Sequence, residues 1–293
     1  MTRKSKSGRR GALLVEFALI ALVFYLLISI VVDFGRMMYV AQSLQDAARV
    51  AARELAVTPL PADATFEQAL VDPAVQLRVF DPALLVIDLD TFASQAALDA
   101  FLAALPAVNQ ALRPVMIYER VNVAGADRNL LRYPGALLSD PASPSGLTVG
   151  VPRIASRDAN GVETIEWVPI LGELRTDPAD PLTGPFSATS ASPQRGMVAV
   201  VINYPFQAAA TSSFRQNPAG PFEPNIGFPN QADDGAVTQL NAPAVGTVQP
   251  VTSLNGTYAG PFGLGRQLAM RQELRPFRRL VTAQALYRRE VFQ

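Results

Sequence analysis

The residue types that most often carry out chemistry in proteins are scarce in this chain of 293 residues, which contains no Cys and no His. Without Cys there is no disulfide framework, thiolate nucleophile or zinc–thiolate site, and without His there is no imidazole base or ligand. The lysines, Lys4 and Lys6, both lie at the N-terminus, which excludes a later Schiff-base or P-loop lysine. We therefore expect a protein that is not an enzyme and uses no cofactor.

Carboxylates are the remaining chemical groups, and two short clusters of them are candidates for binding Ca²⁺. Asp177 and Asp180 lie in TDPADPLTG, and Asp233 and Asp234 lie in NQADDG. Neither cluster has the ligand spacing of an EF-hand loop, and Asp next to Pro or Gly is typical of turns. No spacing singles out a carboxylate pair for glycoside hydrolysis, although a membrane-anchored carboxylate hydrolase stays as a third hypothesis.

One carboxylate, Glu16, lies in an unusual place, inside the apolar run of RRGALLVEFALI. From Ala12 to Val32 the chain is apolar apart from Glu16 and Ser29, and 21 residues are enough to cross a hydrocarbon core of about 30 Å as a helix. The run is too long for the apolar region of a secretory signal peptide, which has about 7–15 residues. The sequence therefore predicts a membrane anchor.

The charge distribution predicts how this anchor is oriented. The chain has 25 basic and 25 acidic residues, and five of the basic residues lie in the first ten positions. The rest of the chain therefore has 20 basic against 25 acidic residues, a net charge of −5, which argues against nucleic-acid binding. A basic segment before the anchor predicts a cytoplasmic N-terminus and an extracytoplasmic C-terminal region.

Two interpretations of Glu16 remain open from the residues alone. A carboxylate inside a membrane helix costs about 2.5–3.5 kcal/mol, unless water or the basic tail reaches it near the cytoplasmic surface. Alternatively, the chain is cut between Gly11 and Ala12, and Glu16 becomes the fifth residue of the mature chain. Glu16 of one subunit would then neutralise the amine of Ala12 in the next, which would set the axial register of a helix bundle.

The helical pattern continues beyond the membrane. From Met37 to Val57 the chain has no Gly or Pro, and Thr58-Pro59 follows. A narrow apolar stripe recurs at three- and four-residue steps, at Leu44, Ala47, Ala48, Ala51 and Leu55. We expect one helix over 12–57, about 69 Å long, with one half in lipid and the other against a soluble domain.

These features carry a family resemblance over about Arg10 to Arg53. A basic leader, a glycine and an apolar helix with a glutamate at its fifth position are similar to the prepilin substrates of type IV pilus systems. The words VEFALI (Val15–Ile20), DFGR (Asp33–Arg36) and AQSLQDAARVAAR (Ala41–Arg53) together resemble the TadE-like pseudopilins of the tight-adherence pilus system.

The resemblance implies roles for particular residues. Gly11 and Ala12 would flank the bond that the prepilin peptidase cuts, and Glu16 would be the assembly glutamate. For Asp33, Gly35 and Arg36 two interpretations stay open: a surface ion pair at the membrane exit, or a glycine that permits close helix packing. The family offers no catalytic residues to transfer.

The resemblance also implies the partners and the location. The expected protein is a minor pseudopilin, a subunit for cell adhesion by tight adherence, in the cytoplasmic (inner) membrane or the pilus. Its partners would be the prepilin peptidase, other pilins and pseudopilins, the inner-membrane pilus platform and the lipid bilayer. The alternative is an uncleaved, signal-anchored envelope protein with an extracytoplasmic binding domain.

Beyond residue 58 the pattern changes to short extended runs separated by Pro and Gly. We expect strands over 75–80, 83–90, 115–123 and 196–206, a helix over 91–105 capped by Asp90 or Thr91, and a hairpin whose arms flank 156–161. Residues 278–292 fit a strand or a helix, and the family resemblance favours a strand beside 197–204 that closes the sheet. The arginines between 271 and 289 fit a surface for an acidic partner or, as we expect, a solvated face.

The sequence thus predicts an α+β fold, in which a long N-terminal transmembrane helix packs on an extracytoplasmic domain with an antiparallel β-sheet and long loops. The expected organisation is a basic prepilin leader (1–11), the transmembrane and extended helix (12–57) and the α+β domain (58–293). A Pro/Gly-rich insertion is expected at about 207–265.

Overall fold

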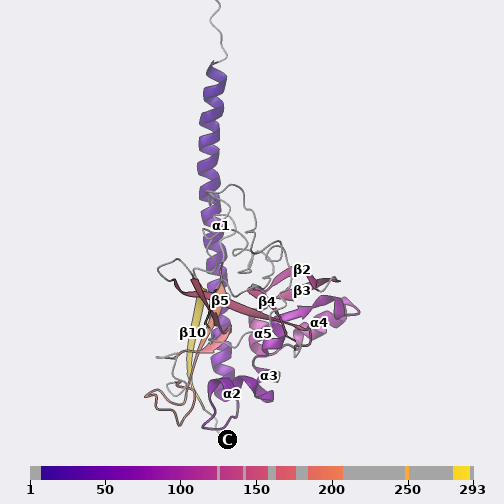
Figure 1. Cartoon of the computed structure of the whole chain (residues 1–293), viewed down its shortest axis with the longest axis vertical. Helices are drawn as coiled ribbons and strands as arrows, with labels where there is room; N and C mark the ends of the chain where they lie inside the picture. Colours follow the sequence, from indigo (N-terminus) through magenta and orange to yellow (C-terminus); the bar gives the residue numbers. More distant parts are fainter. Residues whose placement is uncertain are drawn as a thin grey trace, which may run out of the picture.

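A single long helix, α1 (Gly8–Val57), organises the molecule (Figure 1). The computed structural model describes residues 8–123, 126–140, 143–157, 163–175, 184–206, 248–250 and 280–290. At 50 residues α1 is about 75 Å long. The other described helices and strands gather around the half of α1 that ends at Val57 (Figure 1). This arrangement confirms the predicted α+β architecture.

The C-terminal end of α1 is the predicted one, and its start is earlier than predicted. The hydroxyl and the backbone N–H of Thr58 both donate to the carbonyl of Glu54, at 2.7 and 3.1 Å, and Pro59 prevents a further turn. At the other end the helix begins at Gly8, four residues before the predicted start at Ala12. Arg9 and Arg10 favour helix, and the carbonyls of the first turn accept hydrogen bonds from N–H groups one turn later, so the basic segment extends the helix.

The central sheet has the strand order β10-β8-β7 and packs on α1. Its middle strand, β8 (Met197–Pro205), pairs antiparallel with β10 (Leu280–Arg288) along its whole length and with the short β7 (Leu171–Glu173). Both the central strand and the closing C-terminal strand are therefore confirmed. Val200 and Ile202 of β8 face the same core as Ala283 and Ala285 of β10.

A second sheet has the order β4-β5-β6-β9 and contains the predicted hairpin. Strand β5 (Leu147–Arg157) pairs antiparallel with β6 (Glu163–Val168), and β4 (Ala136–Ser139) lies along the other edge of β5. Strand β9 (Val248–Pro250) pairs with β6. Apart from β9, the predicted insertion at about 207–265 lies outside the described residues.

A third sheet has the order β1-β3-β2 and forms the side arm of the domain (Figure 1). Strand β2 (Ile117–Val123) confirms the strand predicted over 115–123, and it pairs with β3 (Ala126–Arg132). Strand β1 (Val86–Asp88) is much shorter than the strand predicted over 83–90. It lies between the 3₁₀ turns η1 (Pro82–Leu85) and η2 (Leu89–Thr91), which Asp81 and Asp88 cap.

The strand predicted over 75–80 is wrong, because that segment is helical. Helix α2 (Phe66–Val71) begins with a capping box between Thr65 and Gln68. Helix α3 (Pro73–Arg78) follows at once: an Asp72 carboxylate oxygen accepts the N–H of Ala74 at 2.8 Å. An N-cap Asp followed by Pro at the first helical position overrode the β-branched residues on which the prediction relied.

The helix predicted over 91–105 is present but shorter. Helix α4 (Gln95–Ala103) is capped by the hydroxyl of Ser94, and neither Asp90 nor Thr91 caps it. Helix α5 (Ala107–Leu112) and the 3₁₀ turn η3 (Arg113–Val115) follow. Both α5 and η3 pack against α1 and complete the side of the domain opposite the central sheet.

Candidate functional site: the N-terminal helix

The half of α1 between Leu14 and Val32 is apolar apart from Glu16 and Ser29, and its apolar side chains are exposed. It is the one described helix that is long and apolar enough to cross a membrane. Exposing so much apolar surface to water is unfavourable, by roughly 25 cal/mol per Å², so this half of α1 is a candidate membrane anchor. Its exposed large side chains include Leu14, Val15, Phe17, Leu19, Ile20, Leu22, Val23, Phe24, Leu27, Ile28, Ile30, Val31 and Val32.

The other half of α1 is held in the domain by small side chains. The five residues of the predicted apolar stripe are fully buried, and Ala52 and Ala56 widen the buried face. Alanine at these positions lets the backbone of α1 approach β10 and β8 closely. In addition, Nε2 of Gln45 donates to the backbone carbonyl of Gln284 at 3.0 Å, which covers a polar group on edge strand β10.

The predicted processing residues, Gly11 and Ala12, lie within the first turns of α1. The bond between them is therefore part of a helix. Only the backbone conformation is described at these positions.

Glu16 lies four residues beyond Ala12, about 6 Å along the axis, and its side chain is exposed among apolar neighbours. Val15 and Phe17 beside it are 62% and 70% exposed. Within the described part of the chain, Glu16 has no hydrogen-bonding or ion-pair partner. A carboxylate in this position is open to a group from another molecule.

Asp33 and Arg36 form an ion pair at the end of the apolar half. Nη1 of Arg36 lies 3.7 Å from Oδ1 of Asp33, and the Asp33 side chain is only 10% exposed. The Arg36 guanidinium also lies 5.9 Å from the ring centroid of Phe206, the residue that follows β8. A Cβ on Gly35 would meet no atom within 4 Å, so nothing described in this chain occupies the space beside that glycine.

Sequence reasoning missed that the buried face of α1 continues, with polar side chains, into the apolar half of the helix. Ser29 is only 4% exposed, and it precedes Asp33 and Arg36 by four and seven residues, which is the spacing of one helix face. Val40 and Leu44 continue the same face into the domain core. The helical spacing of Ser29, Asp33 and Arg36 was the available signal.

Arg289 was also missed, because the arginines between 271 and 289 were expected to form a solvated face. Residues 271–279 lie outside the described residues, but Arg289 is buried, so the prediction is wrong there. Its guanidinium donates to the carbonyls of Leu60, Pro61 and Phe186 at 2.9, 3.1 and 3.2 Å. It also stacks over the Phe186 ring at 4.5 Å, and burial lowers the pKa of Arg289.

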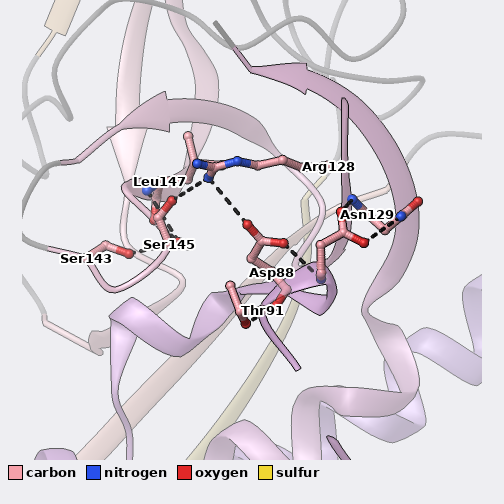
Figure 2. A network of polar contacts seen from close by, with 8 residues as sticks. Asp88, Thr91, Arg128, Asn129, Ser143, Ser145 and Leu147 are labelled. Carbon is pink, nitrogen blue, oxygen red and sulfur yellow. Dashed lines mark hydrogen bonds and ion pairs between the residues drawn. The ribbon is translucent and has the colours of Figure 1, made fainter. Parts of the chain in front are cut away.

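The most concentrated polar cluster outside α1 joins the third sheet to the turn between β4 and β5 (Figure 2). Asp88 lies 3.4 Å from Arg128, which donates to the carbonyl of Ser145 at 2.9 Å. Asp90 accepts two hydrogen bonds of 2.8 Å from Asn129, one from the side chain and one from the backbone N–H. These bonds lower the pKa of Asp90 and favour its ionised form, and the cluster acts as a structural clamp.

A second carboxylate, Glu173 at the end of β7, is almost fully buried. It accepts hydrogen bonds from Nε of Arg175 at 2.9 Å and from the N–H of Phe186 at 2.7 Å. Arg175 also pairs with Glu67 of α2. Burial is the main effect on Glu173 and raises its pKa, despite the opposing hydrogen bonds.

Nothing in the described ranges resembles a metal site: no group of three or more Asp or Glu residues there is placed to hold an ion. The four aspartates considered from the sequence, Asp177, Asp180, Asp233 and Asp234, lie outside the described residues. The described part of the chain offers buried packing contacts and charge pairs, and α1 is its candidate membrane segment.

A comparison with known protein families finds a match within α1. Residues 11–53 match the family model of TadE-like proteins, and the match begins at Gly11 and ends within the domain-bound half of α1. No curated protein and no solved structure matches the chain. The similarity to TadE-like proteins therefore lies in residues 11–53, which contain the exposed apolar half of α1.

Proposed function

We propose that this protein is a non-enzymatic assembly subunit of a tight-adherence pilus, a minor pseudopilin that packs into the pilus or its initiation complex through α1. One observation carries the proposal. The segment that matches TadE-like proteins coincides with a helix whose first half is apolar and exposed, and whose second half is fixed in its own domain. The first half of such a helix is available to other molecules, and the second half is part of the folded domain.

The subunit is made with a basic leader (1–11) and is cut between Gly11 and Ala12 by the prepilin peptidase. Because α1 begins at Gly8, this bond must leave the helical conformation before cleavage. Gly11 favours that opening, since glycine lowers helix stability by about 1 kcal/mol relative to alanine and the first turn has few intrahelical hydrogen bonds. The mature subunit then has the helix (12–57) and the domain (58–293).

Cleavage creates an ammonium group at Ala12, and Glu16 provides its counter-charge. The two groups lie about 6 Å apart along the axis, so parallel neighbouring helices staggered by about 6 Å would place Glu16 of one beside the amine of the next. In an apolar surrounding, each charge needs such a partner. Asp33, Gly35 and Arg36 would mark the point where packed helices leave the membrane, with Gly35 permitting close approach.

Before assembly, the apolar half anchors the subunit in the cytoplasmic (inner) membrane. The basic leader faces the cytoplasm and the domain is extracytoplasmic. Its partners are the prepilin peptidase, the pilus platform in the inner membrane, and other pilins and pseudopilins.

The intact mass of the protein extracted from membranes tests this function. In cells with the cognate peptidase we expect a mature chain that begins at Ala12. Gly11→Val should leave the leader attached without affecting membrane insertion, because it changes the residue before the cut. Gly8→Val is the matched control, a change of the same kind three residues earlier, and should be processed normally. An intact leader on the wild-type protein would instead support a signal-anchored envelope protein.

A further inference from the structure

The geometry of α1 fixes how close the domain lies to the membrane surface. The apolar run ends at Val32, and Val40 is the first residue of α1 in the domain core. Tyr39 is thus seven residues beyond Val32, a rise of about 10 Å. The polar layer on each side of a bilayer is roughly 5–8 Å thick. Tyr39 therefore lies just beyond the headgroup layer, where long side chains on the nearest side of the domain are within reach of the lipid headgroups.

The residues on this side come from three elements. The hydroxyl of Tyr39 donates to the carbonyl of Pro114 at 3.5 Å, which places η3 beside the helix at this level. Strand β2 follows η3 and lies at the end of the domain nearer the apolar half of α1 (Figure 1). We name this surface the membrane-facing rim, which consists of Arg36, Tyr39, Arg113, Tyr118 and Arg120.

The side chains of the rim have the chemistry of a membrane interface. Tyr39 and Tyr118 are 53% and 66% exposed, although each hydroxyl already has a hydrogen bond within the protein. Tyrosine is enriched at the headgroup level, because its ring is apolar and its hydroxyl is polar. The two exposed rings thus suit a contact with lipid headgroups.

The charges of the rim favour an anionic partner. Arg36 is paired with Asp33, and Arg120 lies 2.7 Å from Asp127. Arg113 is exposed, and within the described ranges it has no acidic partner. Arg113 therefore gives the rim a net positive charge, and its planar guanidinium suits the oxygens of a phosphate.

We propose that the membrane-facing rim rests on the phosphate headgroups of phospholipids, with Arg113 as its main phosphate contact. The contact would hold the domain at a fixed height and limit its tilt before the subunit leaves the membrane. This inference rests on the proposed anchoring of α1 in the membrane.

Tryptophan fluorescence of the full chain in vesicles tests the contact. The chain has one Trp, so the parent protein supplies the background signal. Tyr118→Trp keeps an amphipathic ring in the rim, and Leu77→Trp places a control in α3, at the far end of the domain, where Leu77 is 78% exposed. The vesicles contain phosphatidylcholine and phosphatidylglycerol, with a nitroxide quencher on a share of the headgroups. We expect quenching of Tyr118→Trp and none of Leu77→Trp.

Charge reversal tests the role of Arg113. In the Tyr118→Trp background, Arg113→Glu should lower the ratio of bound to unbound domains by roughly fivefold or more, since each basic residue contributes about that factor near an anionic surface. Arg78→Glu, an exposed arginine on α3, is the matched control and should change nothing. Equal quenching with and without phosphatidylglycerol would overturn the preference for anionic headgroups, and undiminished quenching in the Arg113→Glu variant would overturn the phosphate contact.

Resistance to alkaline extraction separates the two proposals. A protein that alkaline carbonate removes from vesicles would overturn the anchor and the rim together. A protein that resists extraction but shows no quenching of Tyr118→Trp would overturn the rim alone.

Discussion

The guanidinium of Arg289 donates a hydrogen bond of 2.9 Å to the carbonyl of Leu60, a residue that lies 229 positions earlier in the chain. This contact ties the strand that closes the central sheet to the segment that follows α1. The N–H of Glu290 reinforces the connection by donating to the carbonyl of Ala56 at 3.0 Å. The domain-bound half of α1 is therefore fixed by a distant part of the chain.

Removing the Arg289 side chain should destabilise the domain. Arg289→Met leaves three buried carbonyls without their charged donor and removes the stacking on Phe186, so we expect a loss of about 3–5 kcal/mol. Urea unfolding of the detergent-solubilised protein, followed by circular dichroism, measures the change. Arg288→Met, at the exposed neighbouring position, should have little effect. Equal unfolding midpoints for the two variants would contradict the role given to Arg289.

Enlarging a buried alanine of α1 should also destabilise the domain. Ala51→Leu adds a branched side chain where α1 meets the core, and overpacking of this kind costs about 1–3 kcal/mol. Arg53→Leu, on the exposed side of the same helix turn, is the matched control. The melting temperature should fall for Ala51→Leu alone, while both variants insert into membranes normally. An unchanged melting temperature would show that this helix–sheet contact is loose.

Removing the charge of Glu16 should separate processing from assembly. Glu16→Gln keeps the size of the side chain but cannot neutralise the amine of Ala12, so cleavage should proceed and incorporation into pili should be lost. Immunoblots of sheared pili and of membranes measure the two steps. Leu22→Ala, an exposed apolar position in the same half of the helix, should assemble. Normal assembly of Glu16→Gln would remove the proposed role of the carboxylate.

The burial of Glu173 predicts a specific pH dependence. Because the pKa of Glu173 is higher in the folded protein than its ordinary value of 4.5, its favourable contribution is greatest below that value and is lost as the pH rises through the folded pKa. Glu173→Gln cannot titrate, so the stability of the variant relative to wild type should improve with rising pH. Urea unfolding at several pH values measures this difference, and a difference independent of pH would contradict the prediction.

Gly184→Ala provides a second test of the Glu173 pocket. A Cβ at position 184 would overlap the Glu173 carboxylate, so this variant should be less stable at every pH. Its loss of stability should persist whether Glu173 is charged or neutral, which distinguishes steric overlap from titration.

The elements that sequence reasoning predicted correctly have strong local signals. The C-terminal end of α1 follows from Thr58-Pro59, and β8 follows from a long β-branched run. The segment 75–80 was misassigned because Val75 and Val79 suggested a strand, whereas the Asp72 cap set the conformation. A local cap was stronger than side-chain propensity there.

The positions that could not be predicted depend on contacts between distant parts of the chain. Nothing next to Arg289 in the sequence indicates that three carbonyls from two other segments surround it. Likewise, the roles of Gln45 and Glu173 require the positions of β10 and of the turn before Phe186. In the first half of α1, the order of Gly11, Ala12 and Glu16 suggested a function. The groups that these residues would contact in an assembly belong to other molecules, so the sequence of this chain does not contain them.

The pairing of β10 with β8 and α1 has a consequence for biosynthesis. The ribosome makes α1 first. Strand β10, which completes the sheet that packs on α1, is translated more than 200 residues later. If α1 anchors the chain as proposed, its apolar half would enter the membrane long before the surface that holds its other half exists. A copy that ended before residue 280 would lack β10 and would leave part of the alanine face of α1 uncovered.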